Sequence, residues 1–245
     1  MGDKNLNDLL RWSIENTASG PDGTTNEAPR STLNPEALAA LMGGPSDADL
    51  MRESMAHIVS SDPEITLESK LTAFDNLEQL IESLDNANLL SKLGLWTPLL
   101  ACLAHDEAEI RLMAAWCVGT AVQNNEPSQE RLVALGGVEK LVQMAVGRRL
   151  SSAPPPPAAN GEEAGEKVNG TGKEEEETQK VRRKAVYALS SAVRNYQPAM
   201  DVCAAELRRQ GQNEHVGDEG KTVDATDMDA VDVVINGLRE KVNGA

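Results

Sequence analysis

The sequence contains few of the residues from which catalytic and metal sites are built. Its only histidines, His57, His105 and His215, have no partner at a ligand spacing such as HExxH. The glycine and lysine at 172–173 lack the GxxxxGK[ST] spacing of a phosphate loop, and the acidic tail VDATDMDAVD lacks the glycine and closing glutamate of a calcium loop. We therefore expect no catalytic residue, metal or cofactor, and we interpret the chain as non-enzymatic.

Cysteines and long apolar runs are also scarce. Cys102, Cys117 and Cys203 lie singly, and an odd count without CxxC spacing indicates reduced thiols rather than a disulfide framework. The N-terminus has no signal-peptide pattern, and no apolar run approaches the roughly 18 residues that span a bilayer. The net charge of −16 disfavours nucleic acid and anionic membranes as partners. We expect a soluble, cytoplasmic monomer whose partner carries basic patches.

Aromatic residues are the scarcest type, with three Trp, two Tyr and one Phe, yet half of them occupy one repeated position. A shift of 42 residues places Phe74 on Trp116, and a shift of 71 places Trp116 on Tyr187 and Arg111 on Arg182. The second shift exceeds the first by 29 residues, which indicates an insertion. A period near 42 with apolar helical texture is typical of stacked helical repeats.

We predict an all-α, armadillo-like helical repeat solenoid with a short N-terminal helical segment and a disordered insertion. The insertion has four consecutive prolines, many glycines and a glutamate run, so nothing in it could bury a core and we expect a disordered loop between two repeat helices. The predicted divisions are a flexible, partly helical segment (1–62), armadillo-like repeats (63–146), the insertion (147–180), a continuation of the array (181–210) and a polar linker with a C-terminal helix (211–245).

Apolar periodicity and cap residues locate the helices along the chain. Glycines at 94, 136 and 137 interrupt the apolar pattern at equivalent points of the repeat. The predicted helices cover residues 4–16, 35–42, 47–59, 64–83, 86–93, 96–104, 107–124, 128–135, 137–146, 179–195, 198–209 and 228–241.

The last helix of each predicted repeat should line the concave side of the array. The repeated aromatic position lies on this helix, so two interpretations are open for it. The three rings are either packed in the core or form a partly exposed ladder that anchors a partner. Three arginines lie on or at the ends of the same helices; each alone suits a solvated surface, but together they could grip an acidic partner: Arg111, Arg182 and Arg194.

Several segments go beyond a generic repeat: ENTASG after LLRWSI, LMRESMAHIVS, LTAFDNLEQLIESLDNANLLSKLGLW, GTAVQNNEPSQERLVALGGVEKLV and VRRKAVYALSSAVRNYQP. They closely resemble the fungal armadillo-type nucleotide exchange factors of the seventy-kilodalton heat-shock chaperone. The match runs from Leu9 to about Pro198. The resemblance implies that the concave surface embraces lobe II of the chaperone's ATPase domain, opens the nucleotide cleft and speeds the release of ADP and then of client.

Matched segments and concave geometry together predict the partner-binding residues: Asp85, Asn86 and Ala87 ending one concave helix, Trp116, Thr120, Gln123 and Asn124 along the next, and Tyr187, Arg194 and Asn195 on the third. Ala87 is the sharpest test, because Ala87→Arg on a docking surface should abolish binding and leave unfolding nearly unchanged. The N-terminal helix either mimics a hydrophobic client or docks on the array as a cap, through Leu9, Leu10, Trp12 and Ile14.

One departure and one alternative function accompany the resemblance. Longer relatives continue with further repeats, whereas this chain turns polar after Arg209, so contacts from later repeats are not carried over and the helix at 228–241 is a candidate cap. The alternative function is a generic armadillo scaffold that binds extended peptides. That function requires an asparagine ladder along the concave helices, but the ladder positions hold Glu78, Thr120 and Ser191.

Overall fold

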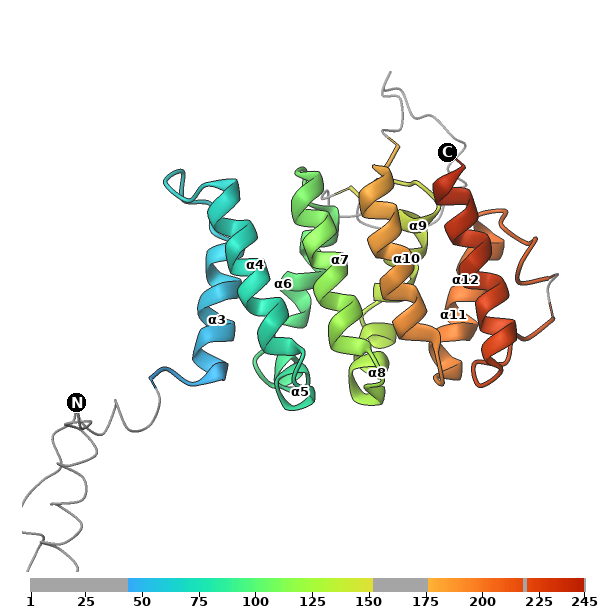
Figure 1. The fold of residues 1–245 in the computed structure, drawn as a ribbon, viewed down its shortest axis with the longest axis horizontal. Helices are drawn as coiled ribbons and strands as arrows, with labels where there is room; N and C mark the ends of the chain where they lie inside the picture. The colour runs from blue at the N-terminus through green and yellow to red at the C-terminus, as the bar shows by residue number, and fades with distance from the viewer. Residues whose placement is uncertain (1–43, 152–175, 218–219, 245) are drawn as a thin grey trace, which may run out of the picture. The chain divides into compact units, whose positions relative to one another are not determined.

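The computed structural model describes residues 44–151, 176–217 and 220–244 (Figure 1). Contacts divide the chain into a unit that ends at Asp49 and a unit from Leu50 to Ala245, and only residues 44–49 of the first unit are described. The predicted helices at 4–16 and 35–42, and with them Leu9, Leu10, Trp12 and Ile14, lie outside the described residues.

Each helix predicted from residue 47 onward is confirmed, with its ends moved by a few residues. The start of the predicted helix 64–83 moves to Leu67 because Thr66 caps it, its hydroxyl accepting a hydrogen bond from the Ser69 N–H at 3.2 Å. The helices are α3 (Asp47–Ile58), α4 (Leu67–Ile81), α5 (Leu84–Lys92), α6 (Trp96–Ala101) with the short η1 (Cys102–Ala104), α7 (Ala108–Val122), α8 (Glu126–Ala134), α9 (Gly137–Ala145), α10 (Gln179–Val193), α11 (Gln197–Arg209) and α12 (Met228–Asn243).

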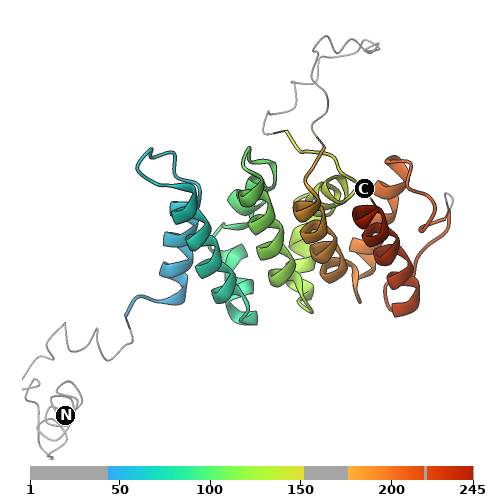
Figure 2. The same cartoon turned by 45° about the horizontal axis from the view of Figure 1, so that its top comes forward.

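The helices from α4 onward form two layers (Figures 1 and 2). The long helices α4, α7, α10 and α12 stand side by side in one layer, and the shorter helices between them form the second. A continuous apolar core fills the space between the layers, with Leu77, Val118 and Leu189 fully buried. This arrangement confirms the predicted all-α, armadillo-like helical array and gives it one face made only of long helices.

The predicted insertion at 147–180 is shorter in the structure at both ends. Arg148 and Glu176 form an isolated antiparallel bridge, and α10 begins at Gln179. Glu177 is only 3% exposed, although it lies within the stretch predicted as a disordered loop. Its burial is explained by an arginine partner described below. Residues 152–175 of the insertion lie outside the described residues.

The described helices are short for membrane-spanning segments. No single one of them is long and apolar enough to cross a bilayer. One pair, Leu84–Lys92 with Trp96–Ala104, passes when taken together, by length and composition alone, although the two are bent by 93°. Leu90 and Leu99, one from each member of this pair, are fully buried in the core. Within the described ranges, no group of three or more His, Cys, Asp or Glu side chains could hold a metal ion.

A candidate protein-binding groove on the long helices

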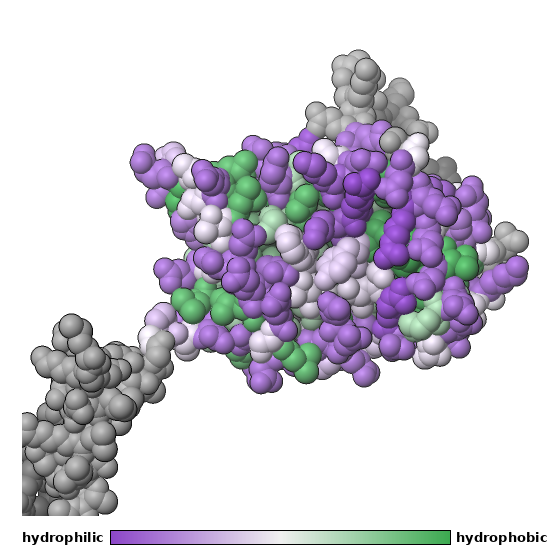
Figure 3. Space-filling model, viewed as in Figure 1, coloured by the Kyte–Doolittle hydropathy of each residue, from purple (hydrophilic) through white to green (hydrophobic). Residues whose placement is uncertain are grey.

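A groove of about 470 Å³ lies across α4, α7 and α10, and we call it the aromatic groove. The middle of the face that these helices form, over α7 and α10, is of intermediate hydropathy and is bordered by hydrophilic residues (Figure 3). The groove brings together five of the predicted partner-binding residues from two different repeats. Its lining consists of Glu78, Glu82, Trp116, Thr120, Gln123, Asn124 and Tyr187.

The two aromatic rings of the groove are partly exposed and surround one ammonium group. Lys184 Nζ lies 3.5 Å from the centroid of the Trp116 ring and 5.4 Å from that of the Tyr187 ring. Both distances fall within the range of cation–π attraction. Burial lowers the pKa of Lys184 below its usual 10.5, and the charge of Glu78 opposes that shift. The Tyr187 hydroxyl donates a long hydrogen bond of 3.4 Å to Gln123 Oε1.

Gly119 makes room for the Tyr187 ring. A Cβ at residue 119 would lie 2.5 Å from Tyr187 Cε1 and 3.1 Å from the Cα of Ala188, so only glycine allows this close approach of α7 and α10. Residues 116, 119 and 123 recur at helical spacing on one side of α7. The absence of a side chain at 119 therefore places the Tyr187 ring between Trp116 and Gln123 on that side.

The third ring of the repeated position has a different environment. Phe74 is fully buried in the core, whereas Trp116 and Tyr187 are half-buried. Of the two interpretations left open by the sequence, core packing is correct for Phe74 and partial exposure is correct for the other two. One repeated sequence position thus supplies one core residue and two groove residues.

Asn124 and Asn195 are exposed, and each follows the end of a long helix. Their φ angles are +50° and +57°, in the left-handed region that few residues other than glycine and asparagine adopt readily. The asparagine repeated at this position is thus explained by the turn that ends α7 and α10. Asn124 also lines the groove, whereas the backbone N–H of Asn195 donates to the carbonyl of Ala225 at 2.9 Å.

Asp85, Asn86 and Ala87 open α5 rather than ending the preceding long helix as predicted. Asn86 is buried, and its side-chain amide donates to the carbonyl of Leu80 at 3.0 Å, which caps the end of α4. Ala87 is 2% exposed and belongs to the core, so its expected use as a surface probe of binding is wrong. Only Asp85 of the three is exposed.

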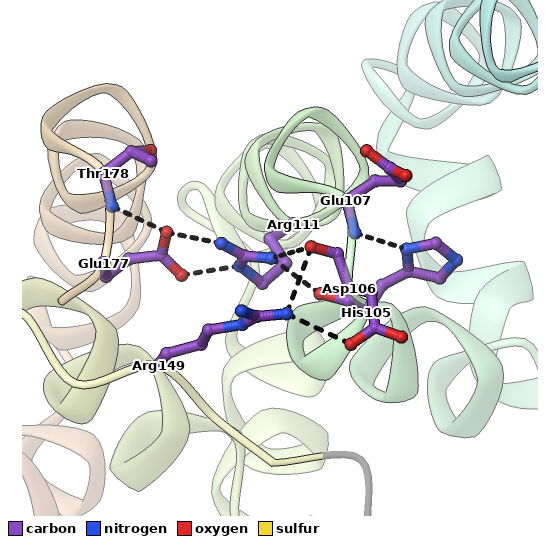
Figure 4. Close-up of polar contacts among 7 residues, drawn as sticks. All are labelled: His105, Asp106, Glu107, Arg111, Arg149, Glu177 and Thr178. Atoms are coloured by element: carbon purple, nitrogen blue, oxygen red, sulfur yellow. Dashed lines mark hydrogen bonds and ion pairs between the residues drawn. The ribbon is translucent and has the colours of Figure 1, made fainter. Parts of the chain in front are cut away.

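Arg111 is 3% exposed and serves the fold (Figure 4). Its Nε and Nη2 atoms donate to the two carboxylate oxygens of Glu177 at 2.6 and 2.8 Å. Its Nη1 donates to the carbonyls of His105 and Asp106 at 2.7 and 2.8 Å, and the Thr178 N–H donates to Glu177 Oε1 at 2.8 Å. This buried pair joins the start of α7 to the chain that leads into α10.

Arg182, the repeat equivalent of Arg111, is also buried and donates to the carbonyl of Ala145 at 3.2 Å and to Glu176 at 3.3 Å. Arg194 is partly exposed and pairs with Asp232, on α12. The prediction that the three repeat arginines form one exposed basic face is therefore wrong. Near the start of each long helix, the arginine instead donates to carbonyls at or just after the end of the helix that precedes it in the chain.

Three residues at or beside the groove were not predicted from the sequence: Glu82 lines it, Lys184 contacts its two rings, and Gly119 makes room for the Tyr187 ring. Lys184 precedes Tyr187 by three residues, so helical spacing alone would have placed it beside that ring. Glu82 follows the last residue of α4, at the end of the helix that also carries Glu78. The sequence carries no comparable signal for Gly119, because its role depends on the packing of two helices from different repeats.

Two helical layers, a shared apolar core and a groove across the long helices define an armadillo-like helical repeat protein. Within the described residues, the groove joins two partly exposed rings with two carboxylates. Exposed aromatic side chains on a rigid helical surface are typical anchors of protein–protein interfaces.

Comparison with known proteins places the chain more closely. A family model described as "Nucleotide exchange factor Fes1" matches residues 6–90. A relative in Gibberella zeae, named Hsp70 nucleotide exchange factor FES1, is 53% identical over all of both chains. A Neurospora crassa relative with an equivalent name is 48% identical over 99% of this chain and all of its own, and one from Coccidioides immitis is 44% identical over 97% and 98%. The chain therefore belongs to the Fes1 family, and the resemblance inferred from its segments is confirmed.

Proposed function

We propose that this chain is a co-chaperone that binds the ATPase domain of Hsp70 through the face of α4, α7 and α10 and promotes release of ADP and then of client. The names of relatives that match the whole chain support the exchange activity. We assign Hsp70 binding to this face because the aromatic groove gathers residues from three of the segments that resemble the family. In this mechanism the protein contributes binding energy and no chemical group.

Exchange by binding alone requires a difference in affinity. The chain must bind the open, nucleotide-free ATPase domain more tightly than the closed, ADP-bound one, because a ligand shifts an equilibrium only by its differential affinity for the two states. By linkage, ADP must then weaken binding of the chain by the same factor. A two-layer array with a continuous core suits this task, since a stiff surface holds the partner in one geometry.

The short array is extended by α12. This helix stands next to α10 in the row of long helices, where a following repeat would place its own long helix (Figure 1). Arg183 donates to Asn243 Oδ1 at 2.9 Å, and Gln179 donates to the carbonyl of Val242 at 2.8 Å. We infer that α12 caps the array and continues the binding face past α10.

A peptide-binding scaffold is the alternative function, and it gains no support from the described residues. Thr120 and Glu78, which occupy two of the three positions of the asparagine ladder, are bonded to each other. The Thr120 hydroxyl donates to Glu78 Oε1 at 2.8 Å. This side-chain pair has no amide group to bond the backbone of an extended peptide, so the exchange activity remains our proposal.

Release of a fluorescent ADP analogue from a purified Hsp70 ATPase domain tests the proposal. The chain should accelerate release in a concentration-dependent manner. Gln123→Arg, an exchange at an exposed residue of the groove, should remove most of the acceleration without changing the free energy of unfolding. Gln79→Arg is the matched control, because it makes the same exchange at an exposed residue of α4 outside the groove. No acceleration by the folded wild-type chain would refute the proposed function.

A further inference from the structure

A positive charge already stands close to the two rings of the aromatic groove. The Lys184 ammonium lies 3.5 Å from the centroid of the Trp116 ring and 5.4 Å from that of the Tyr187 ring. Two carboxylates, those of Glu78 and Glu82, line the same groove. Ring faces and carboxylates both attract cations, so this part of the surface is suited to binding a cation.

The Lys184 side chain is weakly held at the Trp116 ring. Among the ion pairs of the described residues, none includes Lys184, and its ammonium is attached through a flexible four-carbon stem. Burial disfavours its charged form, as its lowered pKa shows. Trp116 and Glu78 are fixed by comparison, because Trp116 packs against the core and Glu78 is bonded to Thr120. Lys184 is not among the residues that line the groove, so its side chain can leave the Trp116 ring while the groove keeps its shape.

Building on the proposed function, we propose that the aromatic groove takes an arginine side chain of the Hsp70 ATPase domain, which replaces Lys184 on the Trp116 ring. A guanidinium suits this place better than an ammonium because it is planar, stacks on aromatic faces, is more weakly hydrated and pairs with carboxylates through two parallel hydrogen bonds. Glu82 is exposed and free of any competing side-chain hydrogen bond among the described residues, so it is the carboxylate we assign to that pair.

Charge supports an arginine of the partner over an acidic group. The chain carries a net charge of −16, which favours encounter with a basic surface. Two of the arginines that the repeat pattern suggested for an acidic partner are engaged within the fold, since Arg111 and Arg182 are buried. Charge complementarity therefore assigns the cation to the partner and the carboxylates to this chain.

Three variants test the assignment by their affinity for the isolated Hsp70 ATPase domain, measured by calorimetry in the absence of nucleotide. Trp116→Leu removes the ring and should weaken binding at least about tenfold, the order of effect of losing an interface anchor. Glu82→Gln removes a charge and keeps the shape, and it should weaken binding several-fold and reduce its salt dependence. Lys184→Met removes the competing ammonium and keeps the stem, so binding should become tighter.

The behaviour of Lys184→Met separates this proposal from its nearest rival. If Lys184 itself binds an acidic group of the partner, Lys184→Met will weaken binding. Weaker or unchanged binding by this variant overturns the proposal. Unchanged affinity of Trp116→Leu or of Glu82→Gln also overturns it. Urea unfolding of each variant separates lost binding from lost folding. A wild-type chain that neither binds the ATPase domain nor accelerates ADP release refutes the proposed function itself, whereas an active wild type with an unaffected Trp116→Leu refutes only this inference.

Discussion

The beginning and the middle of helices α7 and α10 differ in which side chains they bury. Near their N-termini, which we call the closed end, the charged Arg111 and Glu177 are almost completely inside the protein, as is Arg182. One to two turns further along the same helices, the side chains of Trp116 and Tyr187 are only half-buried. This reverses the usual distribution, in which charges face water and large rings fill the core. The contrast shows that a repeated charged residue can serve the fold while a repeated aromatic residue serves the surface.

Breaking the closed end should give the largest loss of stability. Arg111→Ala leaves the Glu177 carboxylate buried without its bidentate partner and takes one donor away from each of the carbonyls of His105 and Asp106. Removing one member of a buried ion pair costs about 3–5 kcal/mol, so we expect a loss of that size in the free energy of urea unfolding. Arg183→Ala, at an exposed residue one position after the repeat equivalent Arg182, should cost less than about 1 kcal/mol. Equal losses would show that the pair is not a structural element.

Ala87 tests the border between core and surface. Ala87→Arg places a long side chain where 2% of the alanine is exposed, and we expect overpacking to cost about 1–3 kcal/mol of unfolding free energy. Asp85→Arg, in the same turn of α5 but exposed, should leave stability within about 0.5 kcal/mol of wild type. Thermal unfolding of both variants measures these losses. An Ala87→Arg variant as stable as wild type would show that Ala87 is a surface residue.

Gly119 tests whether the position of the Tyr187 ring in the groove depends on the close packing of α7 against α10. A Cβ at this position would meet the Tyr187 ring, so Gly119→Ala should push the ring away from α7 and cost about 1 kcal/mol, after the gain that alanine brings to a helix. Chemical denaturation gives the stability, and the NMR shifts of the Tyr187 ring report its displacement. Unchanged shifts together with unchanged stability would mean that the groove does not need glycine at residue 119.

The smallest effect concerns the turn that ends α7. Asn124 has a φ of +50°, so Asn124→Ala should lose roughly 1 kcal/mol, whereas Asn124→Gly should lose almost nothing. Differential scanning calorimetry of the two variants makes the comparison. If alanine and glycine prove equivalent, the asparagine is present for the groove rather than for the turn.

Helix positions followed from the sequence because they depend on local signals. Apolar periodicity, glycine interruptions and cap residues lie within a few residues of the helix ends that they set, although Thr66 was not predicted as a cap. Four of the seven residues that line the groove were also predicted from the sequence, since Trp116, Thr120, Gln123 and Asn124 are neighbours on one helix and its terminal turn. A repeat alignment then added Tyr187 from the next long helix.

Burial could not be predicted for residues whose environment comes from distant parts of the chain. Phe74 and Trp116 occupy the same repeat position, yet different neighbouring helices bury one and expose the other. Arg111 became an interior residue because of Glu177, which stands 66 residues later on the far side of the insertion. Ala87 resembled a docking residue because a small side chain suits a crowded interface and a crowded core equally well.

The most direct test of exchange by binding is the affinity of the wild-type chain for the Hsp70 ATPase domain, measured with and without saturating ADP. The account predicts that ADP weakens binding by the factor by which the chain weakens ADP, about 5- to 150-fold for a typical coupling. Trp116→Leu should reduce the affinity for the nucleotide-free domain toward that for the ADP-bound domain. Equal affinity of the wild-type chain for both forms would contradict the account, because such binding cannot release ADP.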